Sequence, residues 1–359
     1  MKSKFIFACA FCLAALTLTS CSSDDDGGNN GGGHTPNPGT ANRMILEGKI
    51  GDGDGDKIYG NIVYVDLSNK SQKLVERKSW HLGFSTGDAS HVILNQSYTR
   101  AYTSHKTDFA AVTLADTAQA PNLAGGMMDF PNPKEVQIID DTACDLNKTV
   151  FGKIENQESK SEVFFVASDN MKKRSDWFKV KVTATNDGYK VAYGKVGDQT
   201  AKTIEIAKNP AYTFVGFSLE TGKVVKLPRT GEWDLKWSNA MAWTTMPNGK
   251  VILGPSSDVV TTNRYDGVET AEVMVEEVCK YKEFTKADLS KVNFEKRADV
   301  LGTDWRTAPM PNATPGPKAD RFYVIRDVDG ECYKLRFLHF CEQDGGERGR
   351  PELEFELLK

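Results

Sequence analysis

The stretch that decides the fold is SWHLGFS, residues 79–85, because EWDLKWS at 232–238 repeats its pattern. In both stretches a Trp, a Leu and an aromatic residue alternate with other side chains, and Trp80 and Trp233 stand 153 positions apart. Alternation with period two predicts a β-strand that turns these three residues toward the core and makes the Trp residues core anchors. The same alternation predicts that His81 faces solvent.

The similarity between the two stretches extends outward along the chain. Each is preceded by a short strand and a turn, YVDLS from 64 and VGFSL from 215. Each half then closes with a hairpin and a last strand, predicted over 162–169, 177–182 and 189–193 in one half and over 321–327, 332–337 and 351–357 in the other. The sequence therefore predicts an all-β fold of two tandem domains, 42–200 and 205–359, that arose by duplication.

Composition supports a folded β protein and argues against several function classes. The 359 residues are 39% hydrophobic and 26% charged, with 31 Gly and 14 Pro, a balance typical of soluble globular chains rich in turns. The formal net charge is −4 and the chain has no Lys/Arg-rich run, so we expect no nucleic-acid partner.

The first forty residues read as an export and anchoring signal. Lys2 and Lys4 precede a short apolar run that ends in LTSC at 18–21, which resembles a bacterial lipobox. We therefore expect a lipoprotein signal peptide over 1–20, and lipid on Cys21 that anchors the chain in a membrane. Residues 21–41 are rich in Asp, Gly, Asn and Pro and are predicted to form a flexible tether. The alternative is a plain secretory signal with an unused cysteine.

The cysteines beyond the anchor show no metal-binding spacing. Cys144, Cys279, Cys332 and Cys341 form no CxxC pair, so a metal cluster is not expected. Export permits disulfides, and a bond from Cys279 to the strand flanked by Cys332 and Cys341 is one hypothesis. The other is that all four are small buried hydrophobes.

Helical and catalytic signals are few. A helix is considered over 276–284, and Thr285 with Asp288 has the pattern of a helix cap. The run DGDGD at 52–56 resembles the start of a calcium loop, but Lys57 and Val63 occupy positions where an EF-hand needs other residues, which favours a solvated turn. No nucleotide-binding, serine-hydrolase or zinc-protease motif is present, so we expect no enzyme.

The C-terminal half carries an ordered set of residues that resembles a known family. The set comprises the aromatic strands at 212–237, Asn263 with Gly267 and Val268, and the closing strands at 321–359. These resemble the HmuY family, haem-binding β-rich lipoproteins of Gram-negative anaerobes. The resemblance covers about residues 205–359, with a weaker copy over 44–196.

The resemblance implies a haem site with two axial side chains, His or Met, on separate loops. Met310 stands five residues after Trp305, where one family ligand lies, and a thioether is an accepted ligand of haem iron. The hairpin that carries the second family ligand is missing from this sequence, and the substitutes near it along the chain are Met274, Met246 and Met241. In the N-terminal half the corresponding ligand is absent, and Met127 and Met128 are considered as its replacement. The alternative is that these Met residues only fill space.

Two functions follow. The first is a cell-surface lipoprotein of the outer membrane that binds haem or a related porphyrin for iron acquisition and passes it to an outer-membrane receptor. The second is a non-haem binding or adhesion module that keeps the scaffold and has lost the haem ligands. A carbohydrate-active enzyme is a third and weaker hypothesis, because surface carboxylates alone do not distinguish one.

Overall fold

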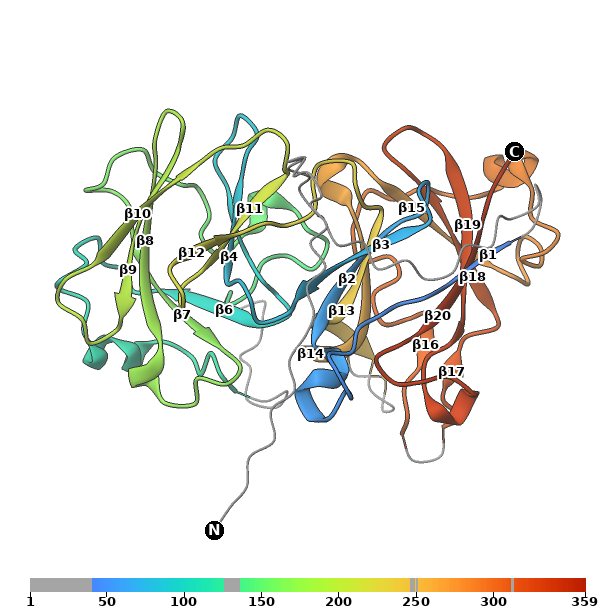
Figure 1. Ribbon diagram of the computed structural model, residues 1–359, viewed down its shortest axis with the longest axis horizontal. Helices are drawn as coiled ribbons and strands as arrows, with labels where there is room; N and C mark the ends of the chain where they lie inside the picture. Colours follow the sequence, from blue (N-terminus) through green and yellow to red (C-terminus); the bar gives the residue numbers. More distant parts are fainter. Residues whose placement is uncertain (1–40, 126–135, 246–248, 250, 311–312) are drawn as a thin grey trace, which may run out of the picture. The chain divides into compact units, whose positions relative to one another are not determined.

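Alternating apolar side chains form antiparallel sheets in both halves of the described chain. The computed structural model describes residues 41–125, 136–245, 249, 251–310 and 313–359, and Figure 1 shows its strands. The signal and tether predictions, and the predictions for Met127, Met128 and Met246, lie outside these residues. The described residues belong to one compact unit.

The strands form two lobes, each with a four-stranded and a five-stranded sheet. The first lobe contains, in sheet order, β12 (Lys223–Val225), β11 (Phe214–Ser218), β4 (Leu82–Ser85) and β5 (Val92–Leu94), and then β10 (Lys202–Ala207), β9 (Gly188–Lys195), β8 (Phe178–Ala184), β7 (Val163–Ser168) and β6 (Thr99–Thr103). The second lobe contains β14 (Val251–Thr262), β13 (Leu235–Thr245), β2 (Asn61–Asp66) and β3 (Ser71–Glu76), and then β1 (Asn42–Ile45), β20 (Glu352–Leu357), β19 (Cys332–His339), β18 (Arg321–Arg326) and β15 (Glu269–Met274). A short ladder joins β16 (Arg306–Thr307) to β17 (Gly316–Pro317).

The two halves of the sequence exchange strands. The hairpin β2–β3 precedes β4 in the chain, yet β2 pairs with β13, with Lys236 opposite Tyr64. In return β11 of the second hairpin pairs with β4, with Gly83 opposite Gly216. The first strand, β1, likewise pairs with the last, β20. Each lobe therefore takes strands from both sides of residue 200, and the division into domains 42–200 and 205–359 stays a prediction about ancestry and boundaries.

Three hydrophobic clusters account for this arrangement. In the first lobe Leu82 and Phe84 pack with Trp177 between the two sheets. In the second lobe Leu235 and Trp237 pack with Tyr323 in the same manner. A third cluster joins the outer faces of the two exchanged hairpins and contains Ile62, Tyr64, Val75, Trp80, Ile93, Phe214, Leu227 and Trp233. Because burial of large apolar side chains is the main favourable term in folding, the exchanged hairpins hold the lobes together.

The all-β prediction is confirmed. Each half closes with the expected hairpin, β7 with β8 and β18 with β19, followed by β9 or β20. The remaining short elements are 3₁₀ turns: η1 (Gly55–Tyr59), η2 (Leu114–Gln119), η4 (Leu146–Lys148), η5 (Arg174–Asp176), η6 (Arg264–Asp266), η7 (Lys286–Lys291) and η8 (Glu342–Asp344). The capping prediction at Thr285 and Asp288 is confirmed at η7. The prediction of a helix over 276–284 is wrong, because this segment forms turns.

The prediction for the N-terminal end of the 79–85 strand is also wrong. Strand β4 begins at Leu82, so its alternation does not extend back to Trp80. Trp80 lies in the cluster between the hairpins, apart from Leu82 and Phe84. His81 is 0% exposed rather than solvent-facing. The Trp residues are core anchors as predicted, although Trp80 and Trp233 anchor the contact between lobes.

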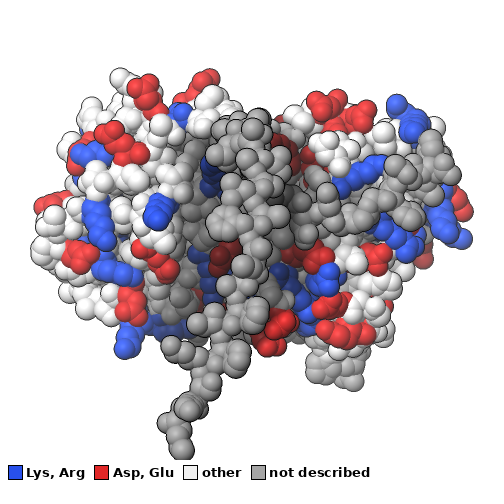
Figure 2. All heavy atoms as spheres, in the orientation of Figure 1, with Lys and Arg blue, Asp and Glu red and all other residues white. Residues whose placement is uncertain are grey.

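The surface carries mixed charge. On the face shown in Figure 2, Lys and Arg side chains are interspersed with Asp and Glu. Within the described part of the chain, no helix has the length and apolar character needed to cross a bilayer.

Candidate functional site

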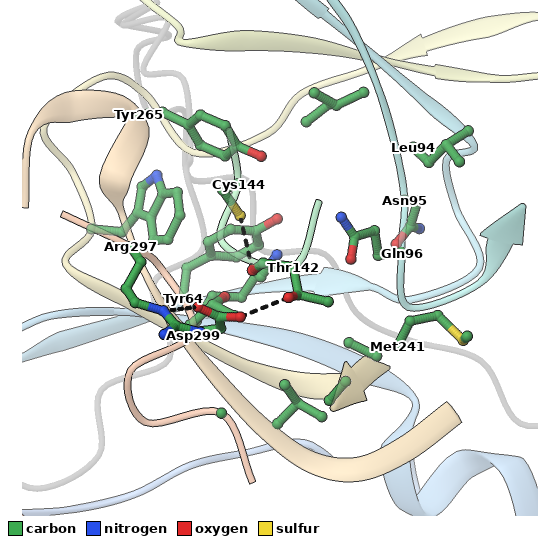
Figure 3. A pocket seen from close by; sticks show the side chains of 18 of the residues that line it. Tyr64, Leu94, Asn95, Gln96, Thr142, Cys144, Met241, Tyr265, Arg297 and Asp299 are labelled. Atoms are coloured by element: carbon green, nitrogen blue, oxygen red, sulfur yellow. Dashed lines mark hydrogen bonds and ion pairs between the residues drawn. The ribbon is translucent and has the colours of Figure 1, made fainter. Parts of the chain in front are cut away.

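A pocket of about 190 Å³ lies where the exchanged hairpins meet β13 and β14. Its wall draws on both lobes, and Figure 3 shows many of the side chains that line it. Its lining includes the aromatic residues Tyr64, Trp80, Phe214, Trp233, Trp243 and Tyr265, and the polar or sulfur-bearing residues Thr142, Cys144, Lys236, Met241, Arg297, Asp299 and Asp304. The pocket therefore exists only because the two halves exchange strands.

Aromatic rings in fixed edge contacts form much of the wall. The ring of Tyr64 meets Trp233 edge-on with centroids 5.1 Å apart, and Phe214 meets Tyr265 edge-on at 4.8 Å. Such T-shaped pairs are favourable beyond the area they bury, so these rings hold one another in place. The result is a rigid apolar surface.

Lys236 is a cationic residue of this wall, and it lies on β13, a central strand of its sheet. Its strand neighbours Leu235 and Trp237 face the core of the second lobe, so alternation turns Lys236 to the opposite face. There it stands in a row between Tyr64 on β2 and Thr261 on β14, and all three residues line the pocket. Burial lowers the pKa of Lys236. Among the described residues no hydrogen bond or ion pair is found at its ammonium.

A polar cluster lies beside the aromatic wall and satisfies its own charges. The carboxylate of Asp299 accepts from the Thr142 hydroxyl at 2.6 Å and pairs with Arg297 at 2.7 Å, as the dashed lines in Figure 3 show. Burial raises the pKa of the nearby Cys144 thiol, which keeps it protonated and neutral. The cluster therefore leaves the charge of Lys236 uncompensated.

Met241 is the methionine of the sequence predictions that reaches this pocket. Its side chain is only 3% exposed, and its Sδ accepts from a guanidinium N–H of Arg100 at 3.6 Å. It also packs in the core of the first lobe. A thioether held in this manner fills space as the packing hypothesis expects.

The other predicted iron ligands lie elsewhere. Met310 is 43% exposed and lies between β16 and β17, a few residues after the fully buried Trp305. Met274 is the last residue of β15 and pairs with Arg321 of β18. Neither belongs to the pocket wall, and Met246 lies outside the described residues. The structure therefore does not bring the predicted ligands together in this pocket.

The described histidines are not grouped with one another or with acidic residues to bind a metal ion. The ring of His81 is buried, and its Nδ1 accepts from the N–H of Leu219 at 3.2 Å. Desolvation lowers the pKa of His81 to about 4, so the ring is neutral at pH 7. His339 is half-exposed at the end of β19. Among the described residues no group of His, Cys, Asp or Glu is arranged to hold a metal ion.

The remaining motif predictions also have structural outcomes. In the predicted calcium loop, Asp56 is exposed and pairs with Lys78 at 2.8 Å, which is consistent with a solvated turn. The four described cysteines are all free, so the disulfide hypothesis for Cys279 is wrong. Cys332 and Cys341 are buried in apolar surroundings, as the alternative expected.

Sequence reasoning missed Lys236 and Asp140. Lys236 reads as an ordinary outward residue of an alternating strand, and only the exchanged hairpin turns that outward face into a pocket wall. Asp140 is buried and accepts the backbone N–H groups of Leu94 at 2.6 Å and Val150 at 2.8 Å. Its burial raises its pKa to about 7. The available signal was the pair Asp140–Asp141 next to an apolar segment.

The fold and the pocket define an all-β protein with a small pocket between two lobes. The family model described as "HmuY protein" matches residues 58–355, which is most of the chain, and the protein therefore belongs to the HmuY family. One match thus spans both lobes.

Two further comparisons complete this picture. A crystal structure of the apo HmuY analog of Tannerella forsythia is similar at 18% sequence identity, with a TM-score of 0.17, over 40% of this chain and 88% of that chain. No curated protein matches the chain.

The described pocket does not fit haem as cargo. Its volume of about 190 Å³ is below the roughly 300–1,000 Å³ of clefts that enclose drug-sized ligands. Its described wall contains no histidine, and its one thioether already accepts a hydrogen bond from Arg100. The described residues of this pocket therefore offer haem iron no histidine and no unengaged thioether.

Proposed function

We propose that the protein captures haem or a related porphyrin outside the cell and passes it to an outer-membrane receptor. Family membership over 58–355 is the observation that carries this proposal. Met310 supports it, because an axial ligand must be accessible to a porphyrin arriving from solvent and this side chain is 43% exposed. Met241 is buried and is set aside as an iron ligand. Met274 and Met246 are proposed as sources of the second ligand.

A titration of the fragment 39–359 with haem tests this proposal. We expect a Soret shift that saturates at one equivalent, stronger for ferrous than for ferric haem because a thioether is a soft ligand. Met310→Leu keeps the apolar volume and removes the sulfur, so its binding should weaken at least tenfold. Met310→His restores a strong ligand and should restore the shift. Met274→Leu and Met246→Leu identify the second ligand.

Two outcomes would contradict the haem proposal. One is the absence of any Soret shift in both redox states. The other is a Met310→Leu variant that titrates like the unchanged protein. Either result favours the alternative, a non-haem binding protein on the same scaffold, for which the small pocket without histidine is the specific supporting observation.

The proposed location is the outer surface of the outer membrane. Residues 1–20 are proposed as a lipoprotein signal and Cys21 as the lipid-bearing residue. The full chain should then sediment with membranes, and Cys21→Ser should appear in the soluble fraction. Equal partition of the two proteins would contradict the anchor.

A further inference from the structure

The size of the pocket limits what it can hold. A dry engineered cavity of about 150 Å³ lined by apolar side chains binds benzene. The pocket between the hairpins, at about 190 Å³, has room for one ring and a small substituent. Its aromatic wall presents both ring faces and edges, which suits a planar ligand.

The two walls differ across the pocket. In the second lobe the row Tyr64, Lys236 and Thr261 carries a cation. In the first lobe the corresponding central row is Gly83 between Gly216 and Ile93. A Cβ at Gly83 would lie 2.8 Å from Ile93 and 3.4 Å from the Trp80 ring, so the glycine lets these side chains pack down onto the strand. The first-lobe wall therefore offers apolar side chains and the neutral amides of Asn95 and Gln96, whereas the second-lobe wall offers the ammonium of Lys236.

The ammonium of Lys236 faces the pocket without a counter-charge. Lys236 is partly buried, and a cation that has lost part of its hydration is stabilised by an opposite charge beside it. Arg297 and Asp299 neutralise each other, and the neutral Cys144 thiol offers no charge. Asp304 also lines the pocket, but it is exposed and water screens its charge. An anion in the pocket would supply the missing partner.

We propose that this pocket binds a small aromatic carboxylate, with its ring against Trp80 and Trp233 and its carboxylate on the ammonium of Lys236. This site goes beyond haem capture and does not depend on it. Trp243, another residue of the wall, is 40% exposed, which indicates a path from solvent.

Three probes separate the contributions of ring and charge in fragment 39–359. Benzoate carries both, benzamide carries the ring without the charge, and acetate carries the charge without the ring. We expect benzoate to bind with one site, measured by calorimetry and by the fluorescence of the tryptophans in the wall. Benzamide should bind roughly tenfold or more weakly, because a hydrogen bond to a charged group contributes more than a neutral one. Acetate should show no saturation at millimolar concentration.

Variants of the lysine complete the test. Lys236→Met should abolish the preference for benzoate over benzamide, whereas Lys236→Arg should keep it. Lys226→Met, at an exposed position outside the pocket, is the matched control and should bind like the unchanged protein. Thermal unfolding confirms that each variant folds, and loss of an unpaired ammonium is expected to leave stability equal or higher.

Three results would overturn the proposal: no benzoate binding at millimolar concentration, equal affinity for benzoate and benzamide, or unchanged discrimination in Lys236→Met. The haem titration of Lys236→Met distinguishes the two sites. Its Soret shift should be intact, because Met310 lies outside the pocket. If benzoate does not bind, the haem proposal is unaffected. If haem does not bind, the benzoate proposal is unaffected.

Discussion

The two lobes have the same backbone frame around different buried polar groups. Just before β4, the N–H of His81 donates to Phe217 at 2.8 Å, and the His81 ring accepts the N–H of Leu219 at 3.2 Å. Just before β13, the N–H of Asp234 donates to Val65 at 2.7 Å, and its carboxylate accepts the N–H of Leu67 at 2.7 Å. The lobes therefore share one device that fastens each exchanged hairpin, built with an imidazole in one and a carboxylate in the other.

A conserved geometry at a nearby asparagine supports the same equivalence. The amide of Asn95 donates to the carbonyl of Trp80 at 2.9 Å, and the amide of Asn263 donates to that of Trp233 at 3.0 Å. The backbone N–H of each Asn also donates to the residue after the Trp. These matched contacts are physical support for the duplication proposed from the sequence.

The difference between His81 and Asp234 shows how burial acts on opposite charges. Desolvation lowers the pKa of His81 to about 4 and raises that of Asp234 to about 7. Both shifts favour the neutral form, because a charged group loses its hydration in the interior. The contributions of His81 and Asp234 to the free energy of unfolding should therefore change in opposite directions with pH. One variant at each position measures each contribution separately.

Asp234→Asn should give the largest effect. The carboxylate has a pKa of about 7 when folded and about 4 when unfolded, so its stabilising contribution is full below pH 4 and is lost as pH rises through 7. The variant keeps an oxygen for the Leu67 N–H. Relative to the unchanged protein, it should gain on the order of 4 kcal/mol in unfolding free energy between pH 4 and pH 8. Urea unfolding at both pH values checks this, and a constant difference between the two proteins would contradict it.

His81→Gln should give a somewhat smaller effect of opposite sign. The folded pKa of about 4 lies below the unfolded value of about 6.5, so the stabilising contribution of His81 is present above pH 6.5 and is lost as pH falls through 4. The unchanged protein should lose on the order of 3 kcal/mol relative to the variant over that interval. Relative to the unchanged protein, Asp234→Asn therefore gains unfolding free energy as the pH rises, and His81→Gln gains it as the pH falls. A parallel response would show that the two positions are not equivalent.

Local features of the fold followed from the sequence, whereas strand partners did not. The hairpins β7–β8 and β18–β19 were predicted because their alternation and turns lie within a few residues. The exchange of β2 and β11 was missed because the two hairpins have similar side-chain patterns and either one satisfies the same alternation. Pairing between distant segments depends on global packing that a local pattern does not contain.

The candidate site was predicted less well than the fold, for related reasons. His81 was placed outward because alternation was extended past the start of β4 at Leu82. Lys236 was missed because an outward polar residue in a strand normally meets water. The iron ligand Met310 and its partners remain predictions, because they rest on family resemblance.

Cross-linking β2 to its partner strand tests the strand exchange on which the pocket depends. Residues opposite each other on neighbouring antiparallel strands have Cβ atoms close enough for a disulfide to form with small adjustment. Tyr64 is opposite Lys236 on β13, whereas without exchange it would lie near Gly83 on β4. In a background where Cys144, Cys279, Cys332 and Cys341 are replaced by Ser or Ala, mild oxidation and peptide mass spectrometry would compare two double variants. We predict a disulfide in Tyr64→Cys/Lys236→Cys and none in Tyr64→Cys/Gly83→Cys, and the reverse result would contradict the exchange.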